Sequence, residues 1–337
     1  MTVLPRILIV APAWVGDAVL AQPLLRRLKA RAPDAVIDVL APPWTRAVFE
    51  RMPEVGAVHD LPFAHGELAL RRRYAIARDL ARQNYTQAVV LPNSLKSALI
   101  PFFARIPRRS GYTGEARWGL LNDVRKLDRA ALPLMIERFA ALAEDQGIPV
   151  QRPLAPVSLA IDAAARAATL ARLGLSAGPK IAVLCPGAEY GPAKRWPLEY
   201  FGDLARRFTA DGWRVWITGS SKDTAAGQAI VAAAGGAGVN LCGKTTLAEA
   251  MDLLSCAEHV VSNDSGLMHV AAALDKPLTA LYGSSSPAFT PPPSARARIV
   301  RIDIACSPCF KRECPLGHFN CMRQLAPDTV WREIMNH

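Results

Sequence analysis

Two adjacent cations, Lys194 and Arg195, end a loop over residues 186–195 that is rich in glycine and proline. Such a loop is typically extended, and a stretch with helical spacing follows it. A lysine supplies a point charge and an arginine a fork of donors, so the two could neutralise a diphosphate. The alternative is a solvated pair beside a core tryptophan, Trp196. We favour anion binding, because a helix terminus suited to phosphate is predicted nearby.

That helix terminus is predicted at residues 263–266, Asn-Asp-Ser-Gly, between a strand and a helix. Aspartate or serine at such a junction is an ordinary N-cap, and this must be part of their role. However, Gly266 lets a ligand approach the backbone, and the first helical turn directs N–H groups and the positive end of the dipole at it. His269 lies four residues after Ser265, on the same helix face. The pattern predicts a phosphate site.

Asp17 follows the first predicted strand, at the end of a loop over residues 12–17. An aspartate before a helix is more often a cap than a catalyst. Placed across a cleft from a diphosphate site, its carboxylate could instead take a proton from an attacking hydroxyl. The residues alone leave both interpretations open.

Residues 238–245 match the P-loop pattern G-x-x-x-x-G-K-T letter for letter. A true P-loop requires a strand directly before its first glycine. Here residues 230–237 are rich in alanine, and the predicted strand, 239–242, lies inside the motif. We therefore predict that Lys244 binds no nucleotide phosphate.

Four cysteines, Cys306, Cys309, Cys314 and Cys321, cluster near the end of the sequence, with His318 among them. Such clustering is typical of a tetrahedral thiolate site for zinc or, less often, of iron–sulfur ligation. The alternative is a set of reduced thiols that order a C-terminal loop. Because four thiolates would complete the coordination, a zinc ion here would be structural rather than catalytic.

Buried strand patterns alternate with helical patterns twice along the chain. The predicted strands are residues 6–11, 36–41, 88–91, 180–185, 214–218, 259–262 and 278–282. A proline-rich linker at 150–156 separates the two series. The alternation predicts an α/β protein with two doubly wound parallel sheets facing a central cleft. The loops that follow the strands, at 12–17, 186–195, 219–223 and 262–266, should then carry the ligands.

Length and composition agree with two globular domains. The chain has 337 residues, with 40 Lys and Arg against 29 Asp and Glu, a net charge of +11. A hydrophobic share of 51% and a charged share of 20% exclude a disordered chain. No apolar run reaches the ~20 residues of a membrane-spanning helix, and the run at 7–13 does not read as a signal peptide. We expect a cytoplasmic protein with reduced cysteines.

The excess positive charge could serve several kinds of partner. Nucleic acid is not expected, because no zinc-finger spacing, RNA-binding signature or basic leucine-zipper pattern accompanies it. A nicotinamide-dependent epimerase is disfavoured, because no G-x-G-x-x-G follows the first strand. A non-catalytic module for an anionic ligand remains a more remote alternative. A phosphorylated or membrane-surface substrate fits best.

Several motifs together resemble a known family. They are Trp-Val-Gly-Asp at 14–17, Leu-Pro-Asn-Ser at 91–94 with Lys96, the stretch at 119–123, Cys-Pro-Gly-Ala-Glu at 185–189 through 197, Gly-Ser-Ser-Lys-Asp at 219–223, Asn-Asp-Ser-Gly-Leu-Met-His at 263–269 and the stretch at 282–287. In this order they resemble the ADP-heptose:lipopolysaccharide heptosyltransferases of glycosyltransferase family 9, and most closely the heptosyltransferase II branch. The C-terminal cysteines depart from the pattern of the best-known members.

The resemblance implies a GT-B fold: an N-terminal acceptor-binding domain (1–155), a C-terminal ADP-sugar-binding domain (156–325) and a helix (326–337) that packs back on the first. It implies inverting transfer of L-glycero-D-manno-heptose from ADP-heptose, with no metal or other cofactor. The acceptor would be the first heptose of a Kdo-lipid A core. The alternative is heptosyltransferase I, which adds that first heptose to Kdo. The enzyme would lie peripherally on the cytosolic face of the inner membrane, against an anionic lipid surface.

The resemblance also assigns roles to residues. Asp17 resembles the general base, and Lys194 the cation that stabilises departing ADP. The donor would contact Gly187, Glu189, Lys194, Arg195, Gly219, Asp223, Asp264, Ser265, Gly266 and His269. The acceptor would contact Trp14, Gly16, Asn93, Ser94 and Lys96.

Overall fold

The computed structural model describes residues 5–63 and 66–336. The chain divides into two compact units, Met1–Val157 and Ser158–His337. The boundary predicted at 155/156 lies two residues before the observed one. The outermost ends of the predicted domains, residues 1–4 and 337, lie outside the described residues.

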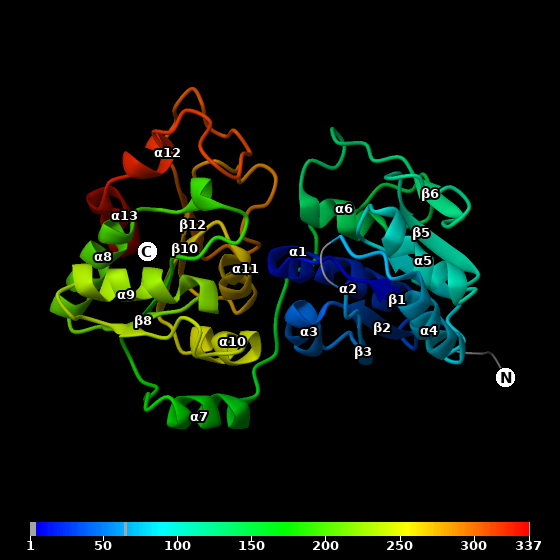
Figure 1. Ribbon diagram of the computed structural model, residues 1–337, viewed down its shortest axis with the longest axis horizontal. Helices are drawn as coiled ribbons and strands as arrows, with labels where there is room; N and C mark the ends of the chain where they lie inside the picture. Colours follow the sequence, from blue (N-terminus) through cyan, green and yellow to red (C-terminus); the bar gives the residue numbers. More distant parts are fainter. Residues whose placement is uncertain (1–4, 64–65, 337) are drawn as a thin grey trace. The chain divides into compact units, whose positions relative to one another are not determined.

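The first unit is built on a six-stranded parallel sheet (Figure 1). Its strands, in spatial order, are β3 (Ala57–Asp60), β2 (Val36–Ala41), β1 (Arg6–Val10), β4 (Gln87–Val90), β5 (Arg108–Tyr112) and β6 (Asp123–Arg125). The central strands β1 and β4 are apolar and buried, because helices cover both faces of a parallel sheet.

Helices form a layer on each side of this sheet (Figure 1). One layer holds α1 (Val15–Leu20), α2 (Gln22–Arg31), α3 (Pro43–Glu50) and α6 (Met135–Ala141), and the other holds α4 (Leu70–Ala81) and α5 (Leu95–Phe103). The apolar residues over 18–29 have helical spacing throughout, yet they belong to two helices, α1 and α2. Pro23 begins a new helix because its ring fits only a first turn, so α1 ends at Leu20.

The second unit repeats the plan. Its strands, in spatial order, are β12 (Ala297–Val300), β11 (Leu278–Leu281), β10 (His259–Asn263), β7 (Ile181–Cys185), β8 (Arg214–Ile217) and β9 (Val239–Asn240). One layer of helices holds α8 (Leu198–Ala210), α9 (Thr224–Ala233) and α13 (Pro327–Met335), and the other holds α7 (Ala163–Arg172), α10 (Leu247–Ser255) and α11 (Gly266–Ala273). Three short helices, η1 (Pro192–Lys194), η2 (Ser221–Asp223) and α12 (Asn320–Arg323), lie in loops.

The C-terminal helix α13 belongs to the core of the second unit. Val330 and Ile334 on its buried face join that core, and the Trp331 ring packs 5.1 Å from that of Phe208 on α8. An ion pair between Asp328 and Arg207 adds to the contact. This helix therefore completes the core of the second unit, and its expected packing against the first domain stays a prediction.

The strand order reverses once in each sheet. β1 neighbours β4 in the first sheet, and β7 neighbours β10 in the second. Open α/β sheets bind ligands at such a reversal, beyond the carboxyl ends of the strands. Loops 12–17 and 91–96 meet there in the first unit, and loop 186–195 meets residues 263–266 in the second. The fold thus gathers most predicted site residues at one place in each unit.

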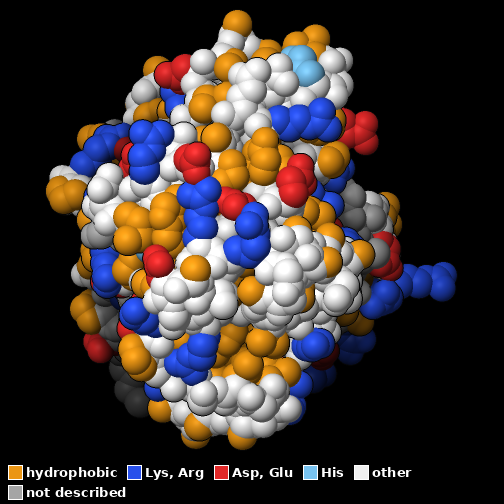
Figure 2. Space-filling model, turned by 90° about the vertical axis from the view of Figure 1, so that its left-hand side faces the viewer, with side chains coloured by type: hydrophobic (Ala, Val, Ile, Leu, Met, Phe, Trp, Pro, Cys, Tyr) orange, Lys and Arg blue, Asp and Glu red, His pale blue; other side chains and the backbone are white. Residues whose placement is uncertain are grey.

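The surface shows no dominant charge on the face in Figure 2, which belongs to the second unit. Lys and Arg side chains there alternate with Asp, Glu and apolar side chains. Among the described residues, no helix has both the length and the apolarity needed to cross a membrane.

Candidate active site

An ion pair occupies the reversal point of the second sheet. Lys194 Nζ lies 2.5 Å from Asp264 Oδ2, with Lys194 17% exposed and Asp264 4% exposed. The hydroxyl of Ser285, from the loop after β11, donates to the same carboxylate oxygen. A cation held this way faces solvent on one side only, so it is suited to receive an anionic ligand.

The helix α11 begins beside this pair. Ser265 is its N-cap residue and Gly266 its first residue, as predicted, so Asp264 directly precedes the end of the helix whose first-turn N–H groups are not used within the helix. His269 is 4% exposed, and its Nδ1 has no hydrogen-bond partner among the described residues. Burial lowers the pKa of His269 to about 4, so the ring is neutral at pH 7 and adds no charge to the site.

A buried amide ties the two loops of this site together. Asn263 Nδ2 donates to the carbonyl of Pro186 over 2.7 Å, and its Oδ1 accepts from the N–H of Trp196 over 3.2 Å. The Trp196 indole in turn donates to the carbonyl of Leu325 over 2.8 Å. Loop 186–195 is thereby fixed against the start of α11.

Asp223 forms a second polar centre of this unit, at the start of α9. Its carboxylate accepts from the N–H of Ser220 over 3.0 Å and from the hydroxyl over 2.8 Å. A Cβ on Gly187 would lie 2.7 Å from Asp223 Oδ2, and one on Gly219 would lie 2.9 Å from Asp223 Cβ. Both predicted glycines therefore serve first to make room for this carboxylate.

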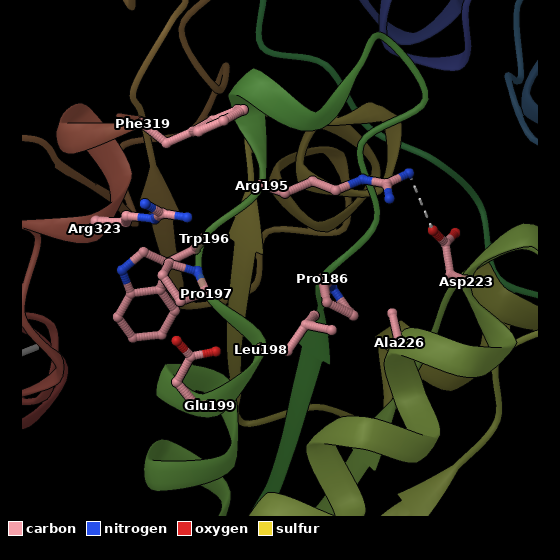
Figure 3. Close-up of a pocket in the computed structure, with 10 residues that line it drawn as sticks. All are labelled: Pro186, Arg195, Trp196, Pro197, Leu198, Glu199, Asp223, Ala226, Phe319 and Arg323. Carbon is pink, nitrogen blue, oxygen red and sulfur yellow. Dashed lines mark ion pairs between the residues drawn. The ribbon is translucent and has the colours of Figure 1, made fainter. Parts of the chain in front are cut away.

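Figure 3 shows a cavity of about 290 Å³ next to Asp223. Arg195 reaches over it, with NH2 3.9 Å from Asp223 Oδ1, and Phe319 and Arg323 line the other side. Aromatic and guanidinium faces beside a carboxylate are suited to a nucleoside. The predicted donor residue Glu189 is instead on the surface, where it pairs with Lys222.

In the first unit, Asp17 lies in the first turn of α1 and is partly exposed. Gly16 precedes it, and Trp14 is the N-cap residue, 47% exposed. A second exposed indole, Trp44, donates to the carbonyl of Ala13 over 2.7 Å and so fixes the loop before Asp17.

The other predicted acceptor residues follow β4, the neighbour of β1. Asn93 is exposed, and Ser94 and Lys96 are partly buried at the start of α5. The buried Arg117 donates to the Pro92 carbonyl over 2.6 Å and to Asn93 Oδ1 over 3.1 Å. These two hydrogen bonds from Arg117 therefore restrain the conformation of the loop at residues 92–93.

The structural context predicted for the P-loop match is confirmed, and the expectation that it binds no nucleotide stays a prediction. A turn rather than a strand precedes Gly238, and β9 lies inside the motif. Lys244 is exposed on a turn. We expect Lys244→Ala to leave the affinity for ADP unchanged within about twofold, as measured by calorimetry, because a solvated lysine contributes little. A tenfold loss would restore the P-loop interpretation.

The four C-terminal cysteines line one cavity of about 20 Å³, together with His318. The N–H of Phe319 donates to Cys314 Sγ over 3.4 Å and lowers the pKa of that thiol. In the described part of the chain, no three His, Cys, Asp or Glu side chains are arranged to hold a metal ion. Structural zinc at these cysteines stays a prediction, which metal analysis of the purified protein can check.

Comparisons with known proteins agree with the motifs. A model of glycosyltransferase family 9 (heptosyltransferase) matches residues 73–320. Lipopolysaccharide heptosyltransferase 2 of Salmonella typhimurium is 44% identical over 338 residues, 98% of this chain and 97% of that protein. Lipooligosaccharide heptosyltransferase 2 of Haemophilus influenzae is 44% identical over 312 residues, 88% of each chain. The chain belongs to glycosyltransferase family 9.

A solved structure of this glycosyltransferase family shows the same fold. Escherichia coli ADP-heptose LPS heptosyltransferase II matches with a TM-score of 0.88 at 42% identity, over 98% of this chain and 97% of that one. The predicted fold class is confirmed: two doubly wound parallel sheets, as in GT-B heptosyltransferases.

Sequence reasoning missed three residues that shape the site of this glycosyltransferase. Ser285 holds Asp264, Arg117 holds Asn93, and Trp44 holds the loop before Asp17. Ser285 lies in the serine-rich stretch at 282–287, which contributed to the family resemblance but gave no sign of a contact with Asp264. Nothing in the sequence pairs Arg117 or Trp44 with its partner, because each contact joins distant segments.

Proposed function

We propose that this glycosyltransferase transfers L-glycero-D-manno-heptose from ADP-heptose to the first heptose of a Kdo-lipid A core. The observation that carries the proposal is the Lys194–Asp264 pair at the start of α11, a half-buried cation beside a helix N-terminus. The family and the near full-length similarity to proteins named heptosyltransferase 2 support the choice of sugar and acceptor.

On the donor side, the diphosphate would bind Lys194 and the first-turn N–H groups of α11. The nucleoside would bind near Asp223, where a carboxylate can accept from ribose hydroxyls and Arg195 lies above. Charge develops on the diphosphate as the anomeric bond breaks. A cation and a helix terminus already in place stabilise that charge more in the transition state than in the ground state.

On the acceptor side, Asp17 would take the proton of the attacking hydroxyl. A single displacement inverts the anomeric centre and requires the base on the face opposite ADP. The exposed indole of Trp14 offers an apolar face to the acceptor sugar. Lys194 and α11 supply the positive charge that a divalent ion would otherwise provide, so we infer that the reaction requires no metal.

The deciding experiment supplies ADP-heptose with either a heptose-free or a mono-heptosylated core acceptor, in buffer containing EDTA, and follows product mass. We expect one heptose to be added to the mono-heptosylated acceptor only. Addition to the heptose-free acceptor alone would favour heptosyltransferase I. ADP binding without any product would favour a non-catalytic binding module. A rate that appears only on adding Mg²⁺ would contradict the metal-free reaction.

We further propose that the first unit contacts an anionic membrane surface through α4, at the cytosolic face of the inner membrane where such acceptors are made. Arg71, Tyr74 and Arg78 are exposed and lie about one turn apart on α4. The Tyr74 ring packs 5.7 Å from that of Phe103 on α5, which in turn lies 5.8 Å from the exposed ring of Phe102. Arginines attract anionic lipid, and aromatic rings favour the interface.

Reversing two of these charges, Arg71→Glu with Arg78→Glu, should lower binding to phosphatidylglycerol-containing vesicles at least tenfold. Each arginine contributes about 1 kcal/mol near an anionic surface, and the attraction should weaken with salt. Cosedimentation at low and high salt measures this. Arg301→Glu, at an exposed ion pair of the second unit, is the matched control. Equal binding by both variants would exclude α4 as the contact.

A further inference from the structure

The loop that carries the catalytic cation is tied to a segment far later in the chain. Tyr190 Oη donates to the carbonyl of Phe310 over 2.8 Å, and Arg312 Nε donates to the carbonyl of Tyr190 over 2.7 Å. The N–H of Ala193 donates to the carbonyl of Arg312 over 3.0 Å. These bonds join the loop to residues 305–323, here called the cysteine-rich segment.

Two cations of these elements lie within about 6 Å of the centre of the Tyr190 ring. Lys194 Nζ lies 5.1 Å from the ring centroid, and Arg312 Cζ lies 5.6 Å from it. Such distances give a cation–π attraction to each. A Cβ on Gly191 would come within 2.3 Å of the Arg312 carbonyl oxygen, so the two backbones approach as closely as only glycine permits.

The same segment also supports the other partner of the ion pair. The N–H of Phe310 donates to the carbonyl of Ser284 over 2.7 Å. The next residue, Ser285, donates its hydroxyl to Asp264. The cysteine-rich segment therefore restrains both partners of the ion pair. It restrains Lys194 through the loop that contains Tyr190, and Asp264 through Ser285.

We propose that the cysteine-rich segment positions Lys194 for the departing diphosphate, acting through Tyr190 and Arg312. The inference rests on the role proposed above for Lys194. A lysine side chain has many rotamers, and restraining it before the reaction removes an entropic cost from the transition state. Tyr190 and Arg312 are positioning residues, since they act on the ammonium and not on the substrate.

Two variants of the full-length chain test the contacts separately. Tyr190→Phe keeps the ring but removes the hydrogen bond to Phe310, and we expect kcat to fall about 2- to 10-fold, as for one lost hydrogen bond. Arg312→Ala removes both the hydrogen bond to Tyr190 and the contact with its ring, and we expect about a tenfold or greater fall. In both, kcat should fall more than the affinity for ADP. Arg312→Lys keeps a cation over the ring and should recover part of the rate.

Arg301→Ala is the matched control, because Arg301 pairs on the surface with Asp303 and should leave kcat unchanged. The decisive step repeats Arg312→Ala in a Lys194→Ala background. If Arg312 acts through Lys194, the second substitution causes no further fall in kcat. Tyr190→Phe supplies the same test should Arg312→Ala fail to fold.

Each outcome bears on the inference. Single-variant losses that vanish in the Lys194→Ala background support positioning. Losses of equal size in both backgrounds overturn it, because the contacts would then be only structural. Unchanged kcat in both single variants also overturns it. Full activity of Lys194→Ala itself would overturn the proposed role of Lys194, and this inference with it. That result differs from the two preceding ones, which would leave the role of Lys194 intact.

Discussion

Asp17→Asn is expected to lower kcat about 100-fold or more while leaving the affinity for ADP unchanged. General bases typically contribute about 10²- to 10⁴-fold, and an asparagine has the shape of aspartate but cannot accept the proton. ADP affinity should not change, because Lys194, Asp223 and α11, proposed to bind ADP, follow β7, β8 and β10 in the second unit, whereas Asp17 follows β1 in the first. Steady-state kinetics and calorimetry with ADP measure the two quantities.

The matched control is Asp34→Asn, the same change at an exposed aspartate of the same unit. It should leave kcat unaltered. The pH profile provides a second test, because loss of a base removes the fall in rate on the acidic side. An Asp17→Asn enzyme that keeps more than a tenth of the wild-type kcat would remove Asp17 as the base.

The apolar central strands were predictable from the sequence, and so was the edge strand β9, predicted at 239–242, whereas the polar strands β5 and β6 were not. β1, β2, β7 and β10 read as apolar runs because helices cover both of their faces. β5 and β6 are short and polar, and the Asp123 carboxylate on β6 accepts from Ser110 and pairs with Arg108, both on β5. Their stability comes from partners brought together by the fold, which a local pattern does not contain.

The candidate site divides in the same way. The elements proposed to bind phosphate could be predicted, because Lys194 precedes a helix and Ser265 caps one within short motifs. The reason for a glycine at position 187 could not be predicted, because the missing side chain makes room for Asp223, which is distant in the sequence. A glycine in a loop predicts that another group packs closely against the backbone there, but only the fold shows that this group is the Asp223 carboxylate.

The second large effect concerns Lys194. We expect Lys194→Ala to lower kcat/KM about 10²- to 10³-fold, the loss usual for one preorganised group at a developing charge. Both the affinity for ADP and kcat should fall, because the ammonium contacts the diphosphate before and during bond cleavage. Lys244→Ala, the same change at the exposed lysine predicted to bind no phosphate, is the control and should keep the wild-type values. An unaffected rate in Lys194→Ala would make this loop structural only.

Part of the loss of ADP affinity in Lys194→Ala should come from Asp264, whose carboxylate no longer has a lysine partner in that variant. Asp264 is 4% exposed, and without Lys194 its negative charge would repel the diphosphate from the start of α11. Adding Asp264→Asn to Lys194→Ala removes this repulsion. We therefore expect the double variant to regain ADP affinity several-fold while kcat stays low, because the cation needed in the transition state is still missing. Recovery of kcat as well would show that Lys194 serves only to neutralise Asp264.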